Sequence, residues 1–364
     1  MQVIPTEPIG SIPRSKDLIS AIQRSISNEI SAQELELQFE IAVKDTIQRF
    51  EETGSPVITD GEQRKSSFVT YPLAGLKNLA ANGIVIPFKD GHTRQLPVLS
   101  AGPFYYGSYA VADLIRAQTI ANRPLKQAVI SASALSLLYP AEPLANYSRE
   151  QFIEDLVRET TKDIRQCLNA GVTVQLDFTE GRLAVKLDPS KGLLKSFIDL
   201  NNQVLANFSV VEQQRIGVHT CPGGDHDSTH CADVDYSSFL PELFQLNVGS
   251  FFVQLASETD RVRALKIMKP FATGARMVFV GVTDPLSSHI ETADEVAKHI
   301  LEAAEYIPLA NLGTTDDCGF APFCDDVSTS RDTAFAKIRA RVEGTKLAAK
   351  ILGVYESETV SASF

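Results

Sequence analysis

The sequence predicts an α/β fold, a (β/α)8 TIM barrel, from three observations. Eight short apolar segments recur along the 364-residue chain, and each ends in polar or small residues. Six of them are separated by segments with the apolar periodicity of amphipathic helices. Strands that alternate with helices build a parallel sheet, and eight such units are typical of a closed barrel. A doubly wound sheet would carry a G-x-G-x-x-G pattern after its first strand, and the chain has none there.

The eight predicted strands share a short apolar body and a polar or small end. They are Thr6–Ser11, Val57–Glu62, Gln127–Ser133, Val172–Asp177, Arg215–Cys221, Ser250–Leu255, Met277–Thr283 and Asn311–Asp317.

Capping sequences indicate where several helices begin. Ser31, Ser148 and Thr292 are each followed three residues later by Glu or Gln, which is the capping-box pattern. The first two helices are expected to end at Gly54 and Gly171, because glycine favours the backbone conformation that terminates a helix.

A β-hairpin is predicted as an insertion between the second and third strands. Its arms are Ile84–Phe88 and Gln95–Leu99, and its turn contains Asp90-Gly91. The closing segment Arg331–Leu352 has the pattern of a helix. We expect residues 1–355 to form one barrel domain and the polar residues 356–364 to be a frayed tail.

Composition and charge restrict the class of protein. The net charge of −11 argues against a surface for nucleic acid or anionic membranes. Five unevenly spread cysteines do not form the framework of a disulfide-rich secreted protein, and neither a signal peptide nor a membrane span is visible. These features predict a cytoplasmic protein, and they are compatible with a homo-oligomer.

Polar residues end almost every predicted strand. In a (β/α)8 barrel these ends meet on one face, where the active site lies, so the ring predicts a polar pocket. Its members are Gly10-Ser11, Asp60 to Glu62, Ser131 and Ser133, Asp177, His219 and Cys221, Gln254 to Glu258, Asp284, and Asp316 to Cys318.

His219, Cys221 and Cys318 are the thiol and imidazole groups that strand ends deliver. Residues at i and i+2 of a strand point to the same side, so His219 and Cys221 can share a ligand, and Cys318 arrives from the last strand. Imidazole and thiolates are typical ligands of tetrahedral zinc, which would hold a bound thiol as a thiolate.

The remaining thiols and histidines receive simpler interpretations. The segment 222–231, with His226, His230 and Cys231, is expected to be a solvated loop. Cys167 lies on the apolar stripe of a helix and is expected in the core, whereas Cys324 is a spare thiol.

Five motifs in order resemble the cobalamin-independent methionine synthase family, specifically its C-terminal catalytic barrel. They are Ile9-Gly10-Ser11-Ile12-Pro13, Gly61-Glu62-Gln63-Arg64, Gln175-Leu176-Asp177, His219-Thr220-Cys221 and Asp317-Cys318-Gly319. The resemblance covers nearly the whole chain. In that family a zinc ion binds the sulfur of homocysteine, which takes a methyl group from a folate.

The resemblance implies roles for particular residues. It makes His219, Cys221 and Cys318 ligands of Zn²⁺. It makes Ser11, Glu62 and Asp177 the anchors of the amino-acid part of the thiol substrate, with Glu62 and Asp177 also in the catalytic set. Gly10 and Arg64 lie in the same motifs and join the predicted substrate-binding set. A pair of carboxylates suits an ammonium group, and the Gly10-Ser11 backbone N–H suits a carboxylate.

Three departures from the family concern the fourth metal ligand, the proton donor and the binding of the methyl donor. The family's glutamate ligand falls in register on Gln254, so we expect Glu258, four residues on, to be the fourth metal ligand because a carboxylate balances the zinc charge. A histidine thought to act as proton donor is displaced here to His289, which joins the predicted catalytic set. The chain has no tryptophan, on which the synthases stack the folate ring.

The leading hypothesis is a zinc-dependent methyltransferase that activates homocysteine, or a similar thiol, as a zinc thiolate for attack on a methyl donor such as 5-methyltetrahydrofolate. The first alternative keeps the zinc and the barrel but uses a non-folate electrophile such as an epoxide, as in the related coenzyme M transferases. The second is a degenerate barrel without catalysis, for which Gln254 is the best argument.

Overall fold

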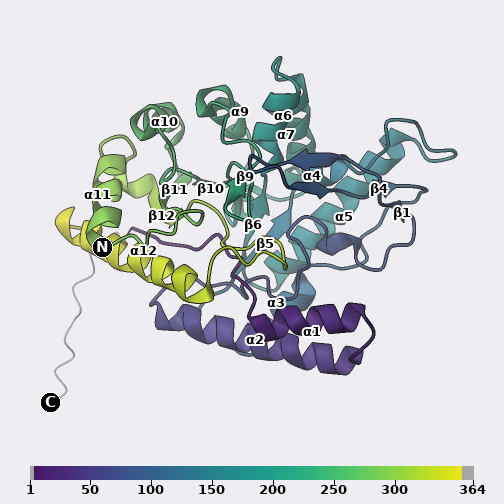
Figure 1. The fold of residues 1–364 in the computed structure, drawn as a ribbon. Helices are drawn as coiled ribbons and strands as arrows, with labels where there is room; N and C mark the ends of the chain where they lie inside the picture. The colour runs from purple at the N-terminus through teal and green to yellow at the C-terminus, as the bar shows by residue number, and fades with distance from the viewer. Residues whose placement is uncertain (1–3, 355–364) are drawn as a thin grey trace.

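Six parallel strands form the main sheet of the protein. The structure, a computed structural model, describes residues 4–354. The strands follow the spatial order β12-β11-β10-β7-β6-β5 (Figure 1). Because adjacent strands are parallel, a crossover segment connects each strand to the next one in the sheet. They are β5 (Lys126–Ile130), β6 (Thr173–Asp177), β7 (Ile216–Thr220), β10 (Ser250–Val253), β11 (Met277–Thr283) and β12 (Leu312–Asp316). Six of the eight predicted strands are therefore present.

Two further segments flank this sheet, one at each edge. Thr6 forms a single parallel bridge to Thr314 of β12, and Ile58 forms one to Leu125, the residue before β5. They are the first and second of the eight predicted strands.

These two segments also contact each other, and this contact closes the barrel. The backbone N–H of Ile12 donates to the Gly61 carbonyl at 3.0 Å, and the Thr59 hydroxyl donates to the Gly10 carbonyl at 2.7 Å. The (β/α)8 barrel predicted from the sequence is confirmed.

The prediction of regular strands at Thr6–Ser11 and Val57–Glu62 is wrong, because each segment makes only one bridge. Pro5 and Pro8 flank the first bridge, and Pro56 precedes the second. Proline has no N–H to donate to a ladder, so pairing stops beside it.

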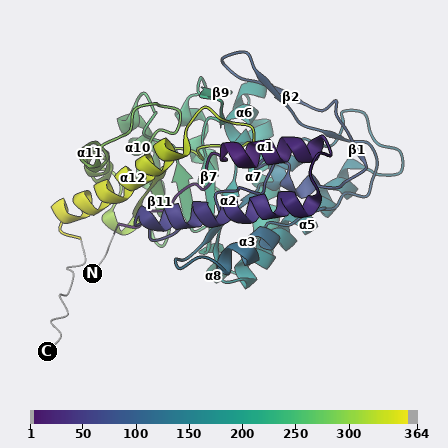
Figure 2. The same cartoon turned by 60° about the horizontal axis from the view of Figure 1, so that its bottom comes forward.

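The helices cover the outside of the barrel (Figure 1). They are α1 (Lys16–Ile26), α2 (Ala32–Glu52), α3 (Val111–Gln118), α4 (Ala132–Ser136), α5 (Arg149–Asn169), α6 (Glu180–Leu187), α7 (Gly192–Leu205), α8 (Val210–Gln213), α9 (Leu240–Leu243), α10 (Arg261–Met268), α11 (Ala293–Ala304) and α12 (Arg331–Ile351). Short 3-10 turns lie at Tyr71–Leu73, Tyr236–Ser238, Lys269–Phe271 and Leu309–Asn311. The capping boxes predicted at Ser31, Ser148 and Thr292 are all formed. Helices α1 and α2 lie side by side (Figure 2).

Short antiparallel pairs stand beside the barrel. They are β2 (Val85–Pro87) with β3 (Thr93–Gln95), β1 (Leu79–Ala80) with β4 (Val98–Leu99), and β8 (Gly224–Asp225) with β9 (Ser228–Thr229). Of the predicted second arm, Gln95 pairs with Val85, whereas Val98 and Leu99 pair with β1. Pro97 explains this split, because it cannot continue the ladder.

Aromatic rings fill the interior of the barrel below the strand ends. Phe252 of β10 and Phe279 of β11 stack with their ring centroids 4.5 Å apart, and Ile9 packs against them. Gly313 of β12 leaves room for this stack, since a Cβ there would lie 2.4 Å from Phe279. The polar strand ends lie above this stack, whereas Lys126 at the amino end of β5 places its Nζ 3.9 Å from the Phe252 ring centroid.

The remaining general predictions have mixed outcomes. Cys167 is fully buried in the core, as predicted.

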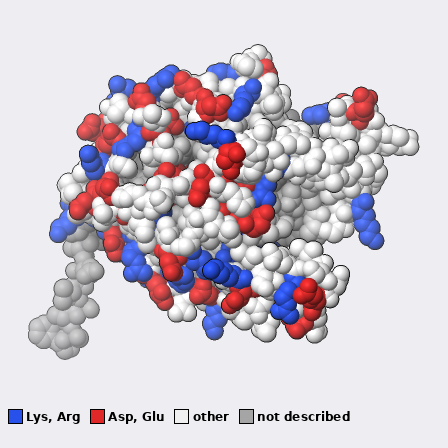
Figure 3. All heavy atoms as spheres, viewed as in Figure 1, with Lys and Arg blue, Asp and Glu red and all other residues white. Residues whose placement is uncertain are grey.

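None of the helices within residues 4–354 is long and apolar enough to cross a membrane. On the face in Figure 3, acidic and basic side chains of the described residues are interspersed, without an extended basic area. The tail 356–364 lies outside the described residues, and the single-domain organisation of residues 1–355 stays a prediction.

Candidate metal and substrate site

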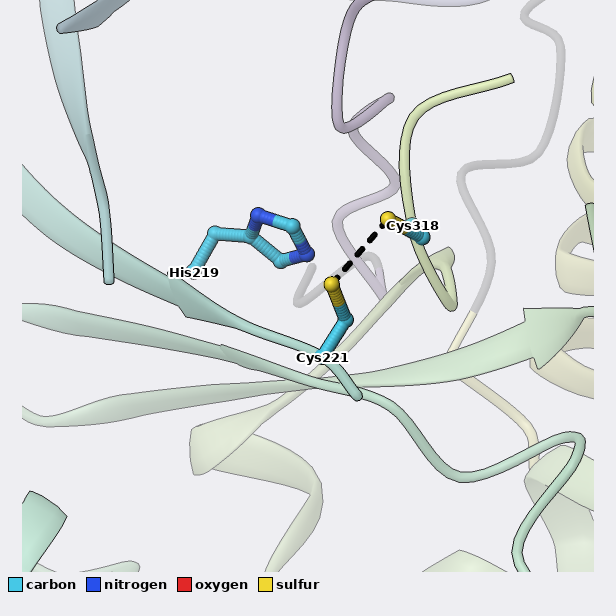
Figure 4. A group of neighbouring side chains, drawn as sticks. All are labelled: His219, Cys221 and Cys318. Atoms are coloured by element: carbon cyan, nitrogen blue, oxygen red, sulfur yellow. Dashed lines mark hydrogen bonds between the residues drawn. The ribbon is translucent and has the colours of Figure 1, made fainter. Parts of the chain in front are cut away.

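Three buried side chains converge at the carboxyl ends of β7 and β12. His219 is in β7, Cys221 is the first residue after β7, and Cys318 follows β12 (Figure 4). One ligand atom from each lies within 4.8 Å of the others, and the two sulfur atoms are 3.1 Å apart. The three residues that the sequence singled out are therefore brought together.

His219 is oriented by a carboxylate on the neighbouring strand. Its Nδ1 lies 3.1 Å from Oδ1 of Asp177, at the end of β6, and a carboxylate at this distance accepts the Nδ1 hydrogen. Nε2 is buried and has no hydrogen-bond partner. A histidine with one nitrogen held by a carboxylate and the other unpartnered has the arrangement of a metal ligand.

The two thiols form a coupled pair. The hydrogen bond from Cys318, and then the His219 imidazole, hold the pKa of Cys221 well below its usual value, and the same bond raises the pKa of Cys318. Burial lowers the pKa of His219, but the charges of Cys221 and Asp177 outweigh burial and raise it to about 10. Thiolate sulfur and imidazole nitrogen are zinc ligands, so this donor set fits zinc.

A small cavity of about 30 Å³ adjoins this cluster. Six members of the predicted ring of polar strand ends line it, namely Ser11, Glu62, Asp177, His219, Cys221 and Cys318. We call it the inner cavity. Ser131 and Ser133 do not line it, because both hydroxyls donate to the buried carboxylate of Glu180.

Glu62 is held in the inner cavity by its backbone and by a buried ion pair. Its φ is +55°, and its N–H donates to Oδ1 of Asp60 at 2.9 Å. Its carboxylate accepts a 2.7 Å hydrogen bond from Lys65 Nζ, and both side chains are almost fully buried. Lys65 also donates to the Ala128 carbonyl at 2.9 Å. Burial raises the pKa of Glu62, and Lys65 opposes that shift. Sequence reasoning missed Lys65.

The buried guanidinium of Arg14 connects three loops around the site. It donates to the carbonyls of Glu62, Lys65 and Ala321 at 2.6, 2.8 and 2.5 Å. No sequence signal marked this arginine, because its carbonyl partners lie 48, 51 and 307 positions away in the chain and leave no local pattern.

Ser11 packs against the residue that follows Cys318. The Ser11 carbonyl accepts the Phe320 N–H at 3.0 Å. A Cβ at Gly319 would lie 2.1 Å from the Ser11 hydroxyl, so only glycine fits there. Gly10 does not line the inner cavity, and its φ of +143° places it in the region that glycine favours.

Glu258 is not brought to the cluster, so its assignment as fourth metal ligand is not supported. Its carboxylate pairs with Arg182 Nη2 at 3.4 Å, which already balances its charge.

Gln254 has the better placement. It lies one residue beyond Val253, which pairs with Thr220, so it stands beside Cys221 and on the same side as Phe252. Its Nε2 donates to Ser257 at 2.7 Å, whereas its buried Oε1 has no partner.

Asp317 shapes the loop that carries Gln254. Its carboxylate accepts the backbone N–H groups of Leu255, Ala256 and Ser257 and the Ser257 hydroxyl, at 2.7 to 2.8 Å. Burial raises its pKa to about 7. The motif Asp317-Cys318-Gly319 was recognised in the sequence, but this structural task of its first residue was not.

Two predicted site residues, Arg64 and His289, do not line the inner cavity. Arg64 makes two 2.8 Å hydrogen bonds to Glu36 of α2, so its guanidinium is turned away from the inner cavity. His289 is 60 % exposed and lies 3.1 Å from Glu295, the capping-box residue of α11, which binds its imidazole at the surface.

The prediction of a solvated loop at residues 222–231 is wrong. Asp225 and Cys231 are fully buried. The β2–β3 hairpin covers this segment, with the Lys89 N–H donating to the Thr229 carbonyl at 3.0 Å and the Asp90 N–H to the Ser228 hydroxyl at 3.2 Å.

Comparisons with known proteins identify a family whose catalytic domain matches this chain. The family model described as "Cobalamin-independent synthase, Catalytic domain" matches residues 4–345. Methionine synthase of Sulfurisphaera tokodaii is 24% identical over 348 residues, which cover 95% of this chain and 93% of the relative. Methionine synthase of Saccharolobus solfataricus is 24% identical over 349 residues, which cover 95% of each chain.

Solved structures share the fold. A B12-independent methionine synthase of Shewanella sp. W3-18-1, in complex with selenomethionine, superposes with a TM-score of 0.70 at 18% identity, over 98% of this chain and 100% of the other. A putative B12-independent methionine synthase of Listeria monocytogenes gives 0.68 at 22% identity, with the same coverage. With the family model matching nearly the whole chain, this protein belongs to the cobalamin-independent synthase family and consists largely of its catalytic domain.

Proposed function

We propose that this protein transfers a methyl group to the sulfur of homocysteine and so forms methionine. Membership of the family and the names of its relatives support the reaction class. The observation that carries the proposal is the buried group of His219, Cys221 and Cys318 on one wall of a cavity whose other walls carry carboxylates.

His219, Cys221 and Cys318 would hold a zinc ion, and Oε1 of Gln254 is the candidate for a fourth contact. The unpartnered, buried atoms His219 Nε2 and Gln254 Oε1 support this assignment, since buried polar atoms normally have partners. When bound, zinc lowers the pKa of a substrate thiol so that the thiolate is present at neutral pH.

The carboxylates of the inner cavity would bind the amino group of homocysteine. Glu62 and Asp177 both line that cavity, and an ammonium group between them forms charge-assisted hydrogen bonds. Asp177 has a second task, because the same carboxylate orients the His219 ring. The Ser11 backbone is placed to receive the substrate carboxylate, since Ser11 also lines the cavity.

The transfer exchanges one bond for another. The homocysteine sulfur, already without its proton, forms a bond to the methyl carbon. The bond between that carbon and its carrier breaks, and the carrier keeps the electron pair and takes up a proton. 5-Methyltetrahydrofolate is one candidate donor, and tetrahydrofolate would then be the carrier. His289 has no part in this scheme, because its imidazole is at the surface.

Metal analysis with cysteine variants tests the proposal. Wild-type protein should bind one zinc per chain and form methionine from homocysteine and a methyl donor. Cys221→Ser and Cys318→Ser should lose zinc and activity together, whereas Cys324→Ser, outside the cluster, should keep its zinc. Full zinc content in both cluster variants, or zinc-independent methionine formation, would refute the proposal.

A further inference from the structure

A second, larger cavity lies beside the inner one. Its volume is about 440 Å³, within the range of small-molecule sites. The two cavities share Phe68, Thr179 and Gly224 in their walls, so a molecule in the larger one lies next to the thiol site. We call it the outer cavity.

The walls of the outer cavity are mainly apolar. Helix α1 contributes Ile19, Ile22 and Ile26, and the β2–β3 hairpin contributes Ile86 and Phe88. Among the described residues that line it, only Arg94 and Asp325 carry a formal charge at neutral pH. Burial lowers the pKa of the lining residue His230 to about 4, so its imidazole is neutral.

The charge of Arg94 is already balanced. Nε and Nη2 donate to Asp225 at 2.5 and 3.0 Å, and Nη1 and Nη2 donate to Asp325, both at 2.9 Å. The guanidinium carbon stands 4.1 Å from the ring centroid of Phe323. With two carboxylates and an aromatic face around it, Arg94 has little attraction left for a further anion.

We propose that the outer cavity binds the methyl donor, and that the part of the donor's carrier lying in this cavity is an uncharged, largely apolar group rather than a polyanion. This inference rests on the proposed transfer to homocysteine. Apolar walls stabilise a carrier by removing its surface from water. A polyanionic tail would need cations, and the lining offers no arginine or lysine other than the neutralised Arg94. The shared wall then puts the methyl carbon beside the homocysteine sulfur.

Two methylating probes distinguish donor binding in the outer cavity from the intrinsic reactivity of the bound thiol. Methyl iodide is too small to need a binding site and reports the reactivity of the bound thiol. Methyl p-toluenesulfonate is uncharged and aromatic and should require the outer cavity. With zinc- and homocysteine-loaded protein, the methylation rate should saturate with the sulfonate, with a half-saturation concentration that does not change between low and high salt. With methyl iodide it should rise linearly.

A carboxylate introduced into the apolar wall provides the decisive variant. Ile22→Asp should raise the half-saturation concentration for the sulfonate by about tenfold or more, because it replaces an apolar contact by a charge. Its rate with methyl iodide should equal that of wild type. Ile41→Asp changes a half-exposed isoleucine of α2 outside the cavity and should behave as wild type with both probes.

The possible failures are distinguishable. No acceleration with methyl iodide over Cys221→Ser would refute the proposed function. In that case, titration with the unreactive p-toluenesulfonamide still tests the cavity, because binding must weaken in Ile22→Asp. Equal binding in wild type and Ile22→Asp would overturn the inference. So would salt-sensitive binding of a triglutamate folate that is much tighter than that of its monoglutamate.

Discussion

The inner and outer cavities share a wall but differ in chemistry. The inner one is lined by carboxylates, thiols and an imidazole, each held by buried hydrogen bonds. The outer one is lined mainly by apolar side chains, with uncharged polar groups among them, and its one arginine is neutralised. In the proposed reaction, charge and metal ligands would select the thiol, whereas shape and apolar surface would select the donor.

This difference also predicts how each region responds to substitution. Groups in the inner cavity depend on partners in a buried environment, where the loss of one partner is costly. An apolar wall tolerates changes of similar volume, because no single contact dominates it. The predictions below test the inner cavity from its strongest interaction to its periphery.

The largest effect is expected at Lys65. Lys65→Met leaves the buried Glu62 carboxylate unpaired, which should lower the free energy of unfolding by about 3–5 kcal/mol in denaturant titrations. Lys65→Arg should retain most of the stability, and the double variant Lys65→Met with Glu62→Gln should recover much of it. An unchanged free energy of unfolding in Lys65→Met would mean that the ion pair between Lys65 and Glu62 does not stabilise the fold.

The same substitution should change the pH dependence of activity. Burial raises the pKa of Glu62, and Lys65 is the largest influence that lowers it. Without Lys65 the pKa rises further, so the ionised carboxylate that binds the ammonium group is lost at a higher pH as the solution is acidified. The acidic limb of the kcat/KM profile should therefore move to higher pH. A profile that shifts to lower pH would contradict this role.

Asp177 should affect metal binding through His219. Asp177→Asn removes the carboxylate that orients the imidazole, and we expect about 10- to 100-fold weaker zinc binding in chelator competition. The homocysteine affinity should fall as well, because one ammonium anchor is lost. Unaltered zinc affinity with weaker homocysteine binding would restrict Asp177 to the substrate.

A smaller effect is expected at the fourth metal position. Gln254→Glu should tighten zinc binding about tenfold, because a carboxylate offsets the cation charge better than an amide. Glu258→Gln is the matched control and should leave the zinc affinity unchanged, since that carboxylate pairs with Arg182. The opposite result would restore Glu258 as the ligand.

No effect on methyl transfer is expected at the periphery. His289→Ala should keep wild-type activity and change the free energy of unfolding by less than about 0.5 kcal/mol, because the side chain is exposed. A loss of activity without a loss of stability would show that His289 reaches the site during turnover.

Local patterns in the sequence were sufficient for the architecture. The barrel, six of its strands and the capped starts of α2, α5 and α11 were predicted, because apolar periodicity and capping residues act within a few positions. The strand-end rule also identified His219, Cys221 and Cys318 as a group, since parallel strands bring their carboxyl ends to one face.

Motif membership alone did not decide which side chains reach the cavity. Glu62 and Arg64 belong to the same motif, yet one lines the inner cavity and the other binds Glu36. Their directions depend on the backbone around Glu62, at φ +55°, and on partners far away in the chain.

The sequence by itself determined the order of strands and helices and the identity of the thiol and imidazole groups. Only the tertiary structure decided that Lys65 holds Glu62, that Arg182 binds Glu258, and that Arg94 is neutralised beside the outer cavity. The physical reason is that a buried charge takes the nearest partner in space. That partner is set by the packing of distant segments, which local sequence patterns do not record.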